Sequence, residues 1–179
     1  DMGRIGSAAA PSSPDMVYAI VEAQDGKGGV FRSDNFGASW EKRSCHMTTT
    51  GQYYNEIVVD PLDPETLNSL DTFSTRSIDG GKTFTPLSTN ARHVDDHALW
   101  IDTNNSSHLI MGGDGGIYES WDGGTKWRHT RNLPIVQFYR IQPDNASPFY
   151  NVCGGTQDNN SLCGPSRTTT KHGITNSDW

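Results

Sequence analysis

An octapeptide that occurs three times constrains this sequence more than any other feature. Its copies are SDNFGASW at 33–40, SIDGGKTF at 77–84 and SWDGGTKW at 120–127. When the copies are aligned on their closing aromatic residue, their third positions lie 44 and then 43 residues apart. A period of this length indicates that one supersecondary unit is repeated along the chain.

The octapeptide has the residue types of a tight turn between two strands. Glycine supplies positive φ, and short Asp, Asn or Ser side chains accept hydrogen bonds from the backbone of the turn. We expect the closing Trp or Phe to point back into a core. Because each polar group has a local backbone role, we interpret these positions as scaffold: Ser33, Asn35, Gly37, Trp40, Ser77, Asp79, Gly81, Phe84, Ser120, Asp122, Gly124 and Trp127.

The composition favours short strands over helices and excludes some partners. The 179 residues include 19 glycines and 9 prolines, and only 33% are hydrophobic. A net charge of -7 without a basic stripe argues against binding to nucleic acid or to an anionic membrane surface. No apolar run approaches membrane-spanning length, so we expect no membrane insertion. The chain begins Asp1-Met2 without a signal peptide, which indicates a processed chain or a piece of a longer one.

The same order of strands and turns recurs around each octapeptide. In each unit two strands joined by a Pro/Asp/Asn/Ser turn precede a third strand that leads into the octapeptide, and a short fourth strand leaves it. The first two strands are expected at 4–10 and 17–23, 55–60 and 67–73, 97–102 and 109–112, and 138–142 and 150–154. The landmark residues Ile5, Ile57, Leu99 and Ile141 are 52, 42 and 42 residues apart, so we place an insertion in the first unit, at 41–54.

These units predict an all-β fold made of β-propeller blades. Four-stranded antiparallel units of this length are the size of such blades. We assign units 4–54, 55–96 and 97–137 and an incomplete fourth unit, 138–179, within one propeller segment spanning 1–179. A segment of a larger propeller is favoured over a four-bladed ring or an oligomer that completes a ring, because open blades would expose apolar faces and strand edges. A solenoid of stacked hairpins is the alternative.

The octapeptide resembles the Asp box of the bacterial neuraminidase repeat, S-x-D-x-G-x-[TS]-[WF]. The middle copy matches it fully, the first departs at Asn35, and the last departs at Lys126. Longer stretches, such as HVDDHALWID at 93–102 and GGTQDNNSLCGPSRT at 154–168, resemble large bacterial propeller proteins of the sortilin or glycosyl-hydrolase-like type. The resemblance implies a propeller and, by itself alone, a secreted or periplasmic location. It does not choose among receptors and hydrolases.

Blade topology sorts the loops into two faces. Because strands alternate in direction, the octapeptides share one face with the turns between first and second strands. The opposite face collects polar residues that the turn pattern does not explain, and it is our candidate ligand surface. Its candidate ligand-binding residues are His93, Asp95, His97, Asp114, Gln157, Asp158 and Asn159.

Three stretches on that face carry the chemistry. If 93–97 is extended, residues 93, 95 and 97 project to one side and could bind a divalent metal or orient a proton donor, although bridging between blades is favoured and no metal site is assigned. Asp114 lies in GGDGG, similar to a Gly-Asp-x-Gly-Gly stretch that carries an acidic catalytic residue in xyloglucan-hydrolysing propellers; Gly-Asp-Gly-Gly is also an ordinary turn. The side chains of 157–160 suit sugar hydroxyls or a peptide backbone.

Recognition of a glycan or peptide, without a cofactor, is the function that we favour. The alternative is a glycoside hydrolase, for which Asp95, Asp114 and Asp158 are the only carboxylates that we would pair. A structural assembly module, which needs no site, is the third hypothesis. In each case the remaining blades or a second copy would complete the ring.

The three cysteines leave the compartment open. Cys153 and Cys163 flank a polar loop and would close it as a disulfide in an oxidising compartment, leaving Cys45 over. The alternative is three free thiols.

Overall fold

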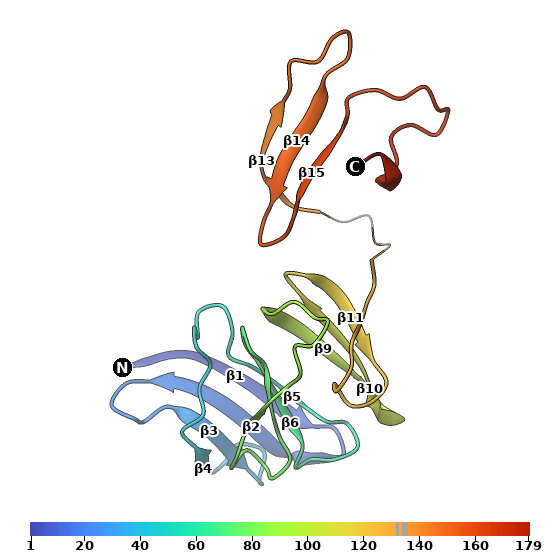
Figure 1. The fold of residues 1–179 in the computed structure, drawn as a ribbon. Helices are drawn as coiled ribbons and strands as arrows, with labels where there is room; N and C mark the ends of the chain where they lie inside the picture. The colour runs from blue at the N-terminus through green and yellow to red at the C-terminus, as the bar shows by residue number, and fades with distance from the viewer. Residues whose placement is uncertain (132, 134–135) are drawn as a thin grey trace. The chain divides into compact units, whose positions relative to one another are not determined.

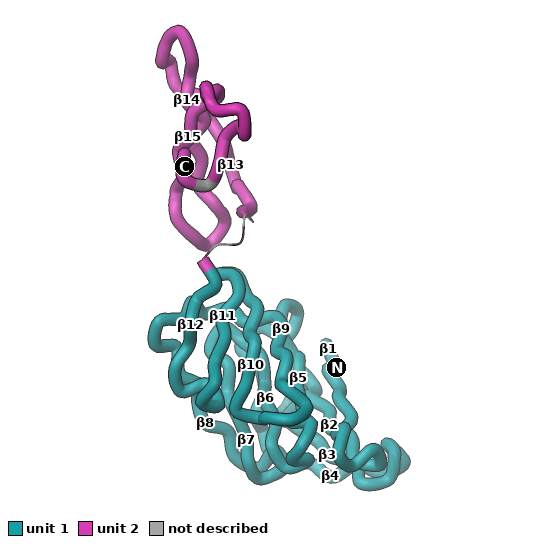
Figure 2. The backbone as a smooth tube through the Cα atoms, turned by 90° about the vertical axis from the view of Figure 1, so that its right-hand side faces the viewer, with its two compact units in different colours: residues 1–130 teal, residues 131–179 magenta. Residues whose placement is uncertain are grey.

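The computed structural model describes residues 1–131, 133 and 136–179 (Figure 1). The chain divides into two compact units, Asp1–Thr130 and Arg131–Trp179 (Figure 2). The described residues form antiparallel strands and one short 3-10 helix, Asn176–Asp178, so the all-β prediction is confirmed. Within these residues no helix has the length and apolar character needed to cross a membrane.

The first unit consists of three four-stranded sheets, each ordered as its strands follow along the chain. The bounds of these strands follow sheet by sheet. The first sheet contains β1 (Met2–Ala10), β2 (Ser13–Ala23), β3 (Gly29–Ser33) and β4 (Glu41–Ser44); the second contains β5 (Glu56–Val59), β6 (Leu67–Leu70), β7 (Thr75–Ser77) and β8 (Thr85–Pro86); the third contains β9 (Asp96–Asp102), β10 (Asn105–Gly113), β11 (Gly116–Ser120) and β12 (Arg128–His129).

The second unit contains a three-stranded sheet. Its strands are β13 (Phe138–Pro143), β14 (Asn151–Thr156) and β15 (Ser161–Pro165). The sequence indicated two strands here, and β15 adds a third that pairs with β14 along its length. The end of the expected unit 97–137 falls partly on 132, 134 and 135, which lie outside the described residues.

The extra length of the first repeat lies mainly in its first two strands. β1 and β2 have 9 and 11 residues, whereas β5 and β6 have 4 each. The expected insertion at 41–54 is therefore mostly wrong, because long paired strands hold residues that the spacing alone assigned to a loop. The 45–55 connection instead lies over the second sheet, where His46 stacks on Phe84 with ring centroids 3.9 Å apart.

Two hydrophobic cores lie between successive sheets of the first unit. One joins the first and second sheets, and its buried members include Tyr18, Ile20 and Leu67. The other joins the second and third sheets and includes Leu70 and Met111. The second sheet thus contributes one face to each core, as expected when strand side chains alternate between faces.

The octapeptides form turns that are bonded internally in the same way. The hydroxyl of the leading serine accepts the N–H of the glycine four residues later, at 2.8 Å for Gly37, 2.9 Å for Gly81 and 2.8 Å for Gly124. That hydroxyl also donates to the third residue, at 2.7 Å for Asp79 and 3.0 Å for Asp122.

Each octapeptide turn lies beside the turn between the first two strands of its sheet. The N–H groups of Phe36, Gly80 and Gly123 donate to the carbonyls of Asp15, Glu65 and Ser107. These bonds hold both kinds of turn at the same edge of each sheet. The loops between second and third strands therefore emerge at the opposite edge.

The glycine in the octapeptide is required by both conformation and packing. Gly81 and Gly124 have φ values of 83° and 88°, which L side chains rarely adopt. A Cβ on Gly81 would lie 2.9 Å from a methyl carbon of Val30.

The closing aromatic residues differ in burial. Trp127 is 7% exposed within the second core, and Phe84 packs against the first core. Trp40 is 45% exposed, so the expectation that it points into a core is wrong. Phe84 and Trp127 each pack toward the preceding sheet, and no described strand of the first unit lies on that side of Trp40.

Candidate functional site

The edge opposite the octapeptide turns gathers loop residues from the second and third sheets. Tyr54 precedes β5, Thr72 lies between β6 and β7, and Asp114 lies between β10 and β11. Asp95 directly precedes β9, and His97 is the second residue of that strand. Four separate segments thus contribute to one cluster.

Backbone hydrogen bonds hold the segment before β9 between its neighbours. The Asp95 N–H donates to the Thr72 carbonyl at 3.1 Å, and the Asp96 N–H donates to the Asp71 carbonyl at 3.2 Å. On the other side, the Asp114 N–H donates to the Asp95 carbonyl at 3.1 Å. The connection between the two sheets is therefore a fixed bridge between the loop before β7 and the loop before β11.

His97 and Asp114 form a partly exposed pair on this bridge. His97 Nε2 lies 3.1 Å from Asp114 Oδ1, and their side chains are 43% and 31% exposed. The His97 ring stacks on the buried Tyr54 ring, with centroids 5.2 Å apart and planes 8° from parallel. A polar pair thus faces solvent while an aromatic ring supports it from below.

Tyr54 also fixes the second carboxylate of the cluster. Its hydroxyl donates to Asp95 Oδ1 at 2.6 Å and accepts from the Thr72 hydroxyl at 3.2 Å. Burial, followed by the hydrogen bond to Asp95, raises the pKa of Tyr54 to about 12. The phenol therefore remains a donor at neutral pH.

The glycines around Asp114 permit close contact with the bridge. A Cβ on Gly113 would lie 2.3 Å from the Asp95 carbonyl oxygen, and a Cβ on Gly115 would lie 2.2 Å from the Cβ of His93. Contacts this short exclude a side chain at either position. The GGDGG sequence thus lets two loops meet and presents the Asp114 carboxylate beside His97.

The segment 93–97 is not extended as the sequence analysis assumed. Asp95 has a φ of 67°, so the backbone turns and the alternation of 93, 95 and 97 does not apply. His93 Nδ1 lies 2.6 Å from the Val94 carbonyl oxygen. Among the described residues no group of three or more His, Cys, Asp or Glu side chains is placed to hold a metal ion.

A buried ion pair anchors the bridge from within. Arg92 and Asp96 form an ion pair, with side chains 0% and 2% exposed. The Ser74 hydroxyl donates to Asp96 Oδ2 at 2.6 Å, and the Arg92 guanidinium lies 5.0 Å from the ring centroid of Trp127. The start of β9 is thus tied to both neighbouring sheets.

Sequence reasoning missed Tyr54, Thr72 and Arg92. The topological rule that selected this face also assigns to it every connection between successive sheets, and Tyr54 lies on such a connection. That rule was applied only to charged residues, His and amides. An aromatic hydroxyl on the same connections was the signal that could have identified Tyr54.

The candidate residues 157–159 belong to the second unit. They form the turn between β14 and β15, where Gln157 N–H donates to the Gln137 carbonyl at 2.9 Å and Gln137 Nε2 donates to Gln157 Oε1 at 3.1 Å. An open hollow of about 530 Å³ lies here. It is lined by Tyr139, Arg140, Gly155, Thr156, Gln157 and Asp158.

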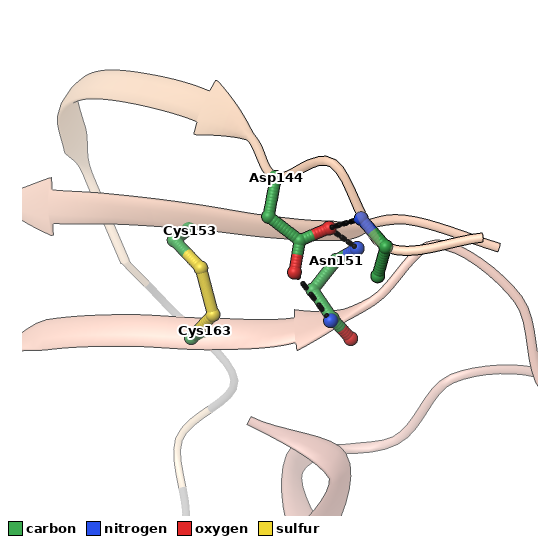
Figure 3. Close-up of a disulfide and its surroundings, with 5 residues drawn as sticks. Asp144, Asn151, Cys153 and Cys163 are labelled. Carbon is green, nitrogen blue, oxygen red and sulfur yellow. Dashed lines mark hydrogen bonds between the residues drawn. A yellow bond between two sulfur atoms is a disulfide. The ribbon is translucent and has the colours of Figure 1, made fainter.

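A disulfide joins the two strands that lead into and out of this turn. Cys153 on β14 and Cys163 on β15 are direct cross-strand partners with a Cα–Cα distance of 4.0 Å (Figure 3). Nearby, the Asp144 carboxylate accepts the backbone N–H of Asn151 at 2.8 Å and its side-chain amide at 2.7 Å (Figure 3). Cys45 is an exposed free thiol.

Comparisons with known proteins identify the fold. No protein-family model matches the chain, and no curated protein is similar to it. Among solved structures, the chain is similar to the GH74 xyloglucanase of Xanthomonas campestris, with a TM-score of 0.55 and 19% identity over 89% of this chain and 28% of that one.

Two further structures are similar. The GH74 enzyme of Niastella koreensis gives a TM-score of 0.55 and 14% identity over 83% of this chain and 25% of its own. YCF48 from Cyanidioschyzon merolae gives 0.51 and 14% identity over 93% of this chain and 56% of its own. This chain therefore spans only about a quarter of the length of the two GH74 enzymes. At these identities the likeness concerns the fold: the chain is a partial β-propeller whose sheets are its blades.

Proposed function

We propose that this chain recognises a glycan or a peptide at the cluster formed by Tyr54, Asp95, His97 and Asp114. The observation that carries the proposal is the His97–Asp114 pair, which is partly exposed and rests on the Tyr54 ring. Structural polar groups in this unit, such as Arg92 and Asp96, are instead buried.

The chemistry of the cluster suits a neutral, hydrogen-bonding ligand. The Asp114 carboxylate offers acceptor oxygens to sugar hydroxyls or peptide N–H groups, and the His97 ring offers an edge that can donate or accept. Fixed backbone bonds on both sides of the bridge mean that binding orders little additional chain. A preorganised polar pair beside an aromatic ring is a common composition for a ligand site.

The resemblance of the octapeptides to the Asp box supports a sortilin-like recognition propeller. In such a protein the octapeptides stabilise the blades, and the ligand binds at the opposite face. We also propose a secreted or periplasmic location, which the disulfide between Cys153 and Cys163 supports because disulfides persist in oxidising compartments.

Glycan and peptide arrays test this proposal with the intact chain. We expect binding signals that His97→Ala and Asp114→Asn each reduce by about tenfold or more, since each variant removes one member of the pair. Asp34→Asn is the matched control, because it removes a carboxylate on the octapeptide face, where Asp34 contacts Arg32. Equal binding by all four proteins would contradict the assignment of the site.

Glycoside hydrolysis is the rival function. It requires two carboxylates that flank a glycosidic bond, and Asp95 and Asp114 are the pair in this cluster. We expect binding without turnover, because the Tyr54 hydroxyl already occupies one oxygen of Asp95. Sugar release from an oligosaccharide that Asp114→Asn abolishes would establish the hydrolase instead. The absence of any array signal would favour a structural assembly module.

A further inference from the structure

The first blade carries an apolar surface on the side that faces away from the second blade. β1, β2 and β3 and the first octapeptide border a hollow of about 740 Å³ there. Its apolar lining includes Ile5, Val21, Phe31 and Trp40, of which Ile5 and Trp40 are 52% and 45% exposed.

The repeat shows that this surface corresponds to an interface between blades. Trp40 occupies the same octapeptide position as Trp127, which is 7% exposed and packs toward the second blade. Phe31 lies two residues before the serine of its octapeptide, as does Tyr118, which is 5% exposed in the same core. Ile5 is the landmark equivalent of Ile57, which is 6% exposed in the first core.

A polar contact accompanies the apolar one at both interfaces that the structure contains. Arg76, directly before the second octapeptide, donates at 2.6 Å to the carbonyl of Gly123 in the third. At the other interface Arg43 donates at 3.0 Å to the carbonyl of Gly80, and Arg32 donates at 2.6 Å to Glu65 beside it. Each octapeptide turn is thus bound by arginine from the blade before it. In the first octapeptide the equivalent carbonyl belongs to Phe36.

We propose that this surface binds a further blade of the same repeat, which packs apolar side chains on Trp40 and Phe31 and donates from an arginine to the carbonyl of Phe36. The argument is continuity with the two interfaces already formed, which bury the same positions and bind the same turn.

The chemistry of the third blade argues against a second copy of this chain as the occupant. Its residue directly before the octapeptide is Glu119, where the first and second blades have Arg32 and Arg76. Glu119 accepts from Arg128 and lies 3.1 Å from His108 Nε2. The far face of the third blade therefore offers a carboxylate at the position where the docking contact needs a donor.

Chain extension tests the proposal directly. Residues 55–95, which contain the second blade and its natural connection to the next, are copied in front of Asp1 of the full chain. With Cys45→Ser and Ile5→Cys as background, we expect maleimide to label the introduced thiol at least about tenfold more slowly in the extended chain, because a docked blade excludes the reagent. Arg76→Ala with Leu70→Asp, in the added copy only, should restore fast labelling.

Unchanged labelling in the extended chain would overturn the proposal. A second test uses the chain without extension: Trp40→Ala should leave the thermal midpoint nearly unchanged, while Trp127→Ala should lower it by several degrees. Equal losses would show that Trp40 is already packed and would also overturn it. Sedimentation provides the last test, since self-association that Trp40→Asp abolishes would make a second copy the occupant.

Discussion

Asp79 is the side chain that closes the second octapeptide turn. Its carboxylate accepts the N–H groups of Lys82 and Thr83 at 3.0 and 2.9 Å and the Thr83 hydroxyl at 2.6 Å. The third turn lacks a hydroxyl at the equivalent of Thr83, and there Asp122 accepts only two backbone N–H groups in addition to the Ser120 hydroxyl. The second turn is thus the more fully bonded of the two.

Asp79→Ala should lower the free energy of unfolding by about 1 to 3 kcal/mol, because three hydrogen bonds to one carboxylate are lost. Asp122→Ala, with one bond fewer to lose, should cost less. Urea unfolding measures both variants, and array binding by the folded Asp79→Ala protein should match the parent. Unaltered stability together with lost binding would place the octapeptide in the ligand site.

Stability should also fall in acid because several carboxylates are bonded in the folded state. Hydrogen bonds, chiefly from Thr83, hold the pKa of Asp79 far below its usual range, and a backbone N–H from Lys126 lowers the pKa of Asp122. The same direction holds for the pKa of Asp102, Glu119, Asp144 and Asp178.

A depressed folded pKa contributes stability that is present above the unfolded pKa and is lost as the pH falls below about 4. The unfolding midpoint in urea should therefore decrease between pH 5 and pH 3 while changing little between pH 6 and pH 8. Asp79→Asn should show a shallower decrease over the acid range. A midpoint that is flat down to pH 3 would show that these bonds do not favour the ionised carboxylates.

Individual residues show where sequence reasoning reached its limit. The face that carries Asp114 follows from strand direction, which the repeat fixes. The pairing of Asp114 with His97 depends on a positive φ at Asp95 and on contacts of Gly113 and Gly115 that join two loops across blades. Such conformations depend on tertiary packing, so the local pattern at 93–97 wrongly indicated an extended run.

Strand ends were also decided by contacts that the pattern does not contain. The sequence extended the second strand of the second blade to Phe73, but β6 ends at Leu70. Asp71 accepts the N–H and hydroxyl of Thr49 from the preceding connection, and its own N–H donates to Ser74 Oγ. These bonds turn the chain and leave Phe73 59% exposed.

The link between the second and third blades depends on Arg76. Besides its bond to the Gly123 carbonyl, Arg76 Nε donates at 2.9 Å to Asn68 Oδ1. Burial lowers the pKa of this guanidinium, although it remains charged at any accessible pH. Two hydrogen bonds from one partly buried cation thus cross from β7 to β6 and to the neighbouring turn.

Arg76→Ala should lower the free energy of unfolding by about 2 to 4 kcal/mol, since hydrogen bonds to a charged group are worth more than neutral ones. Arg128→Ala is the matched control, because Arg128 is 77% exposed where it pairs with Glu119 and exposed pairs contribute about 1 kcal/mol or less. Urea unfolding compares the two. Equal effects would show that the contact between blades adds nothing beyond a surface ion pair.

At the scale of the whole chain, the two units rely on different stabilising interactions. Both hydrophobic cores of buried residues lie in the first unit, between its three blades. In the second unit, Tyr139 and Ile141 on β13 are 72% and 61% exposed. The Cys153–Cys163 disulfide and the bonds around Asp144 are the specific links that join its strands (Figure 3).

Reduction of the disulfide should therefore act on the second unit alone. A small unit with little buried apolar surface depends strongly on a cross-link, and loss of a native disulfide typically costs about 2 to 5 kcal/mol. Hydrogen exchange measured by mass spectrometry should show faster exchange at 138–165 after reduction, or in Cys153→Ser with Cys163→Ser, while exchange at 56–77 stays unchanged. Cys45→Ser controls for the remaining thiol and should leave both regions as they were. Faster exchange throughout both units would show instead that they unfold as one cooperative body, and that the disulfide stabilises the three blades of the first unit as well.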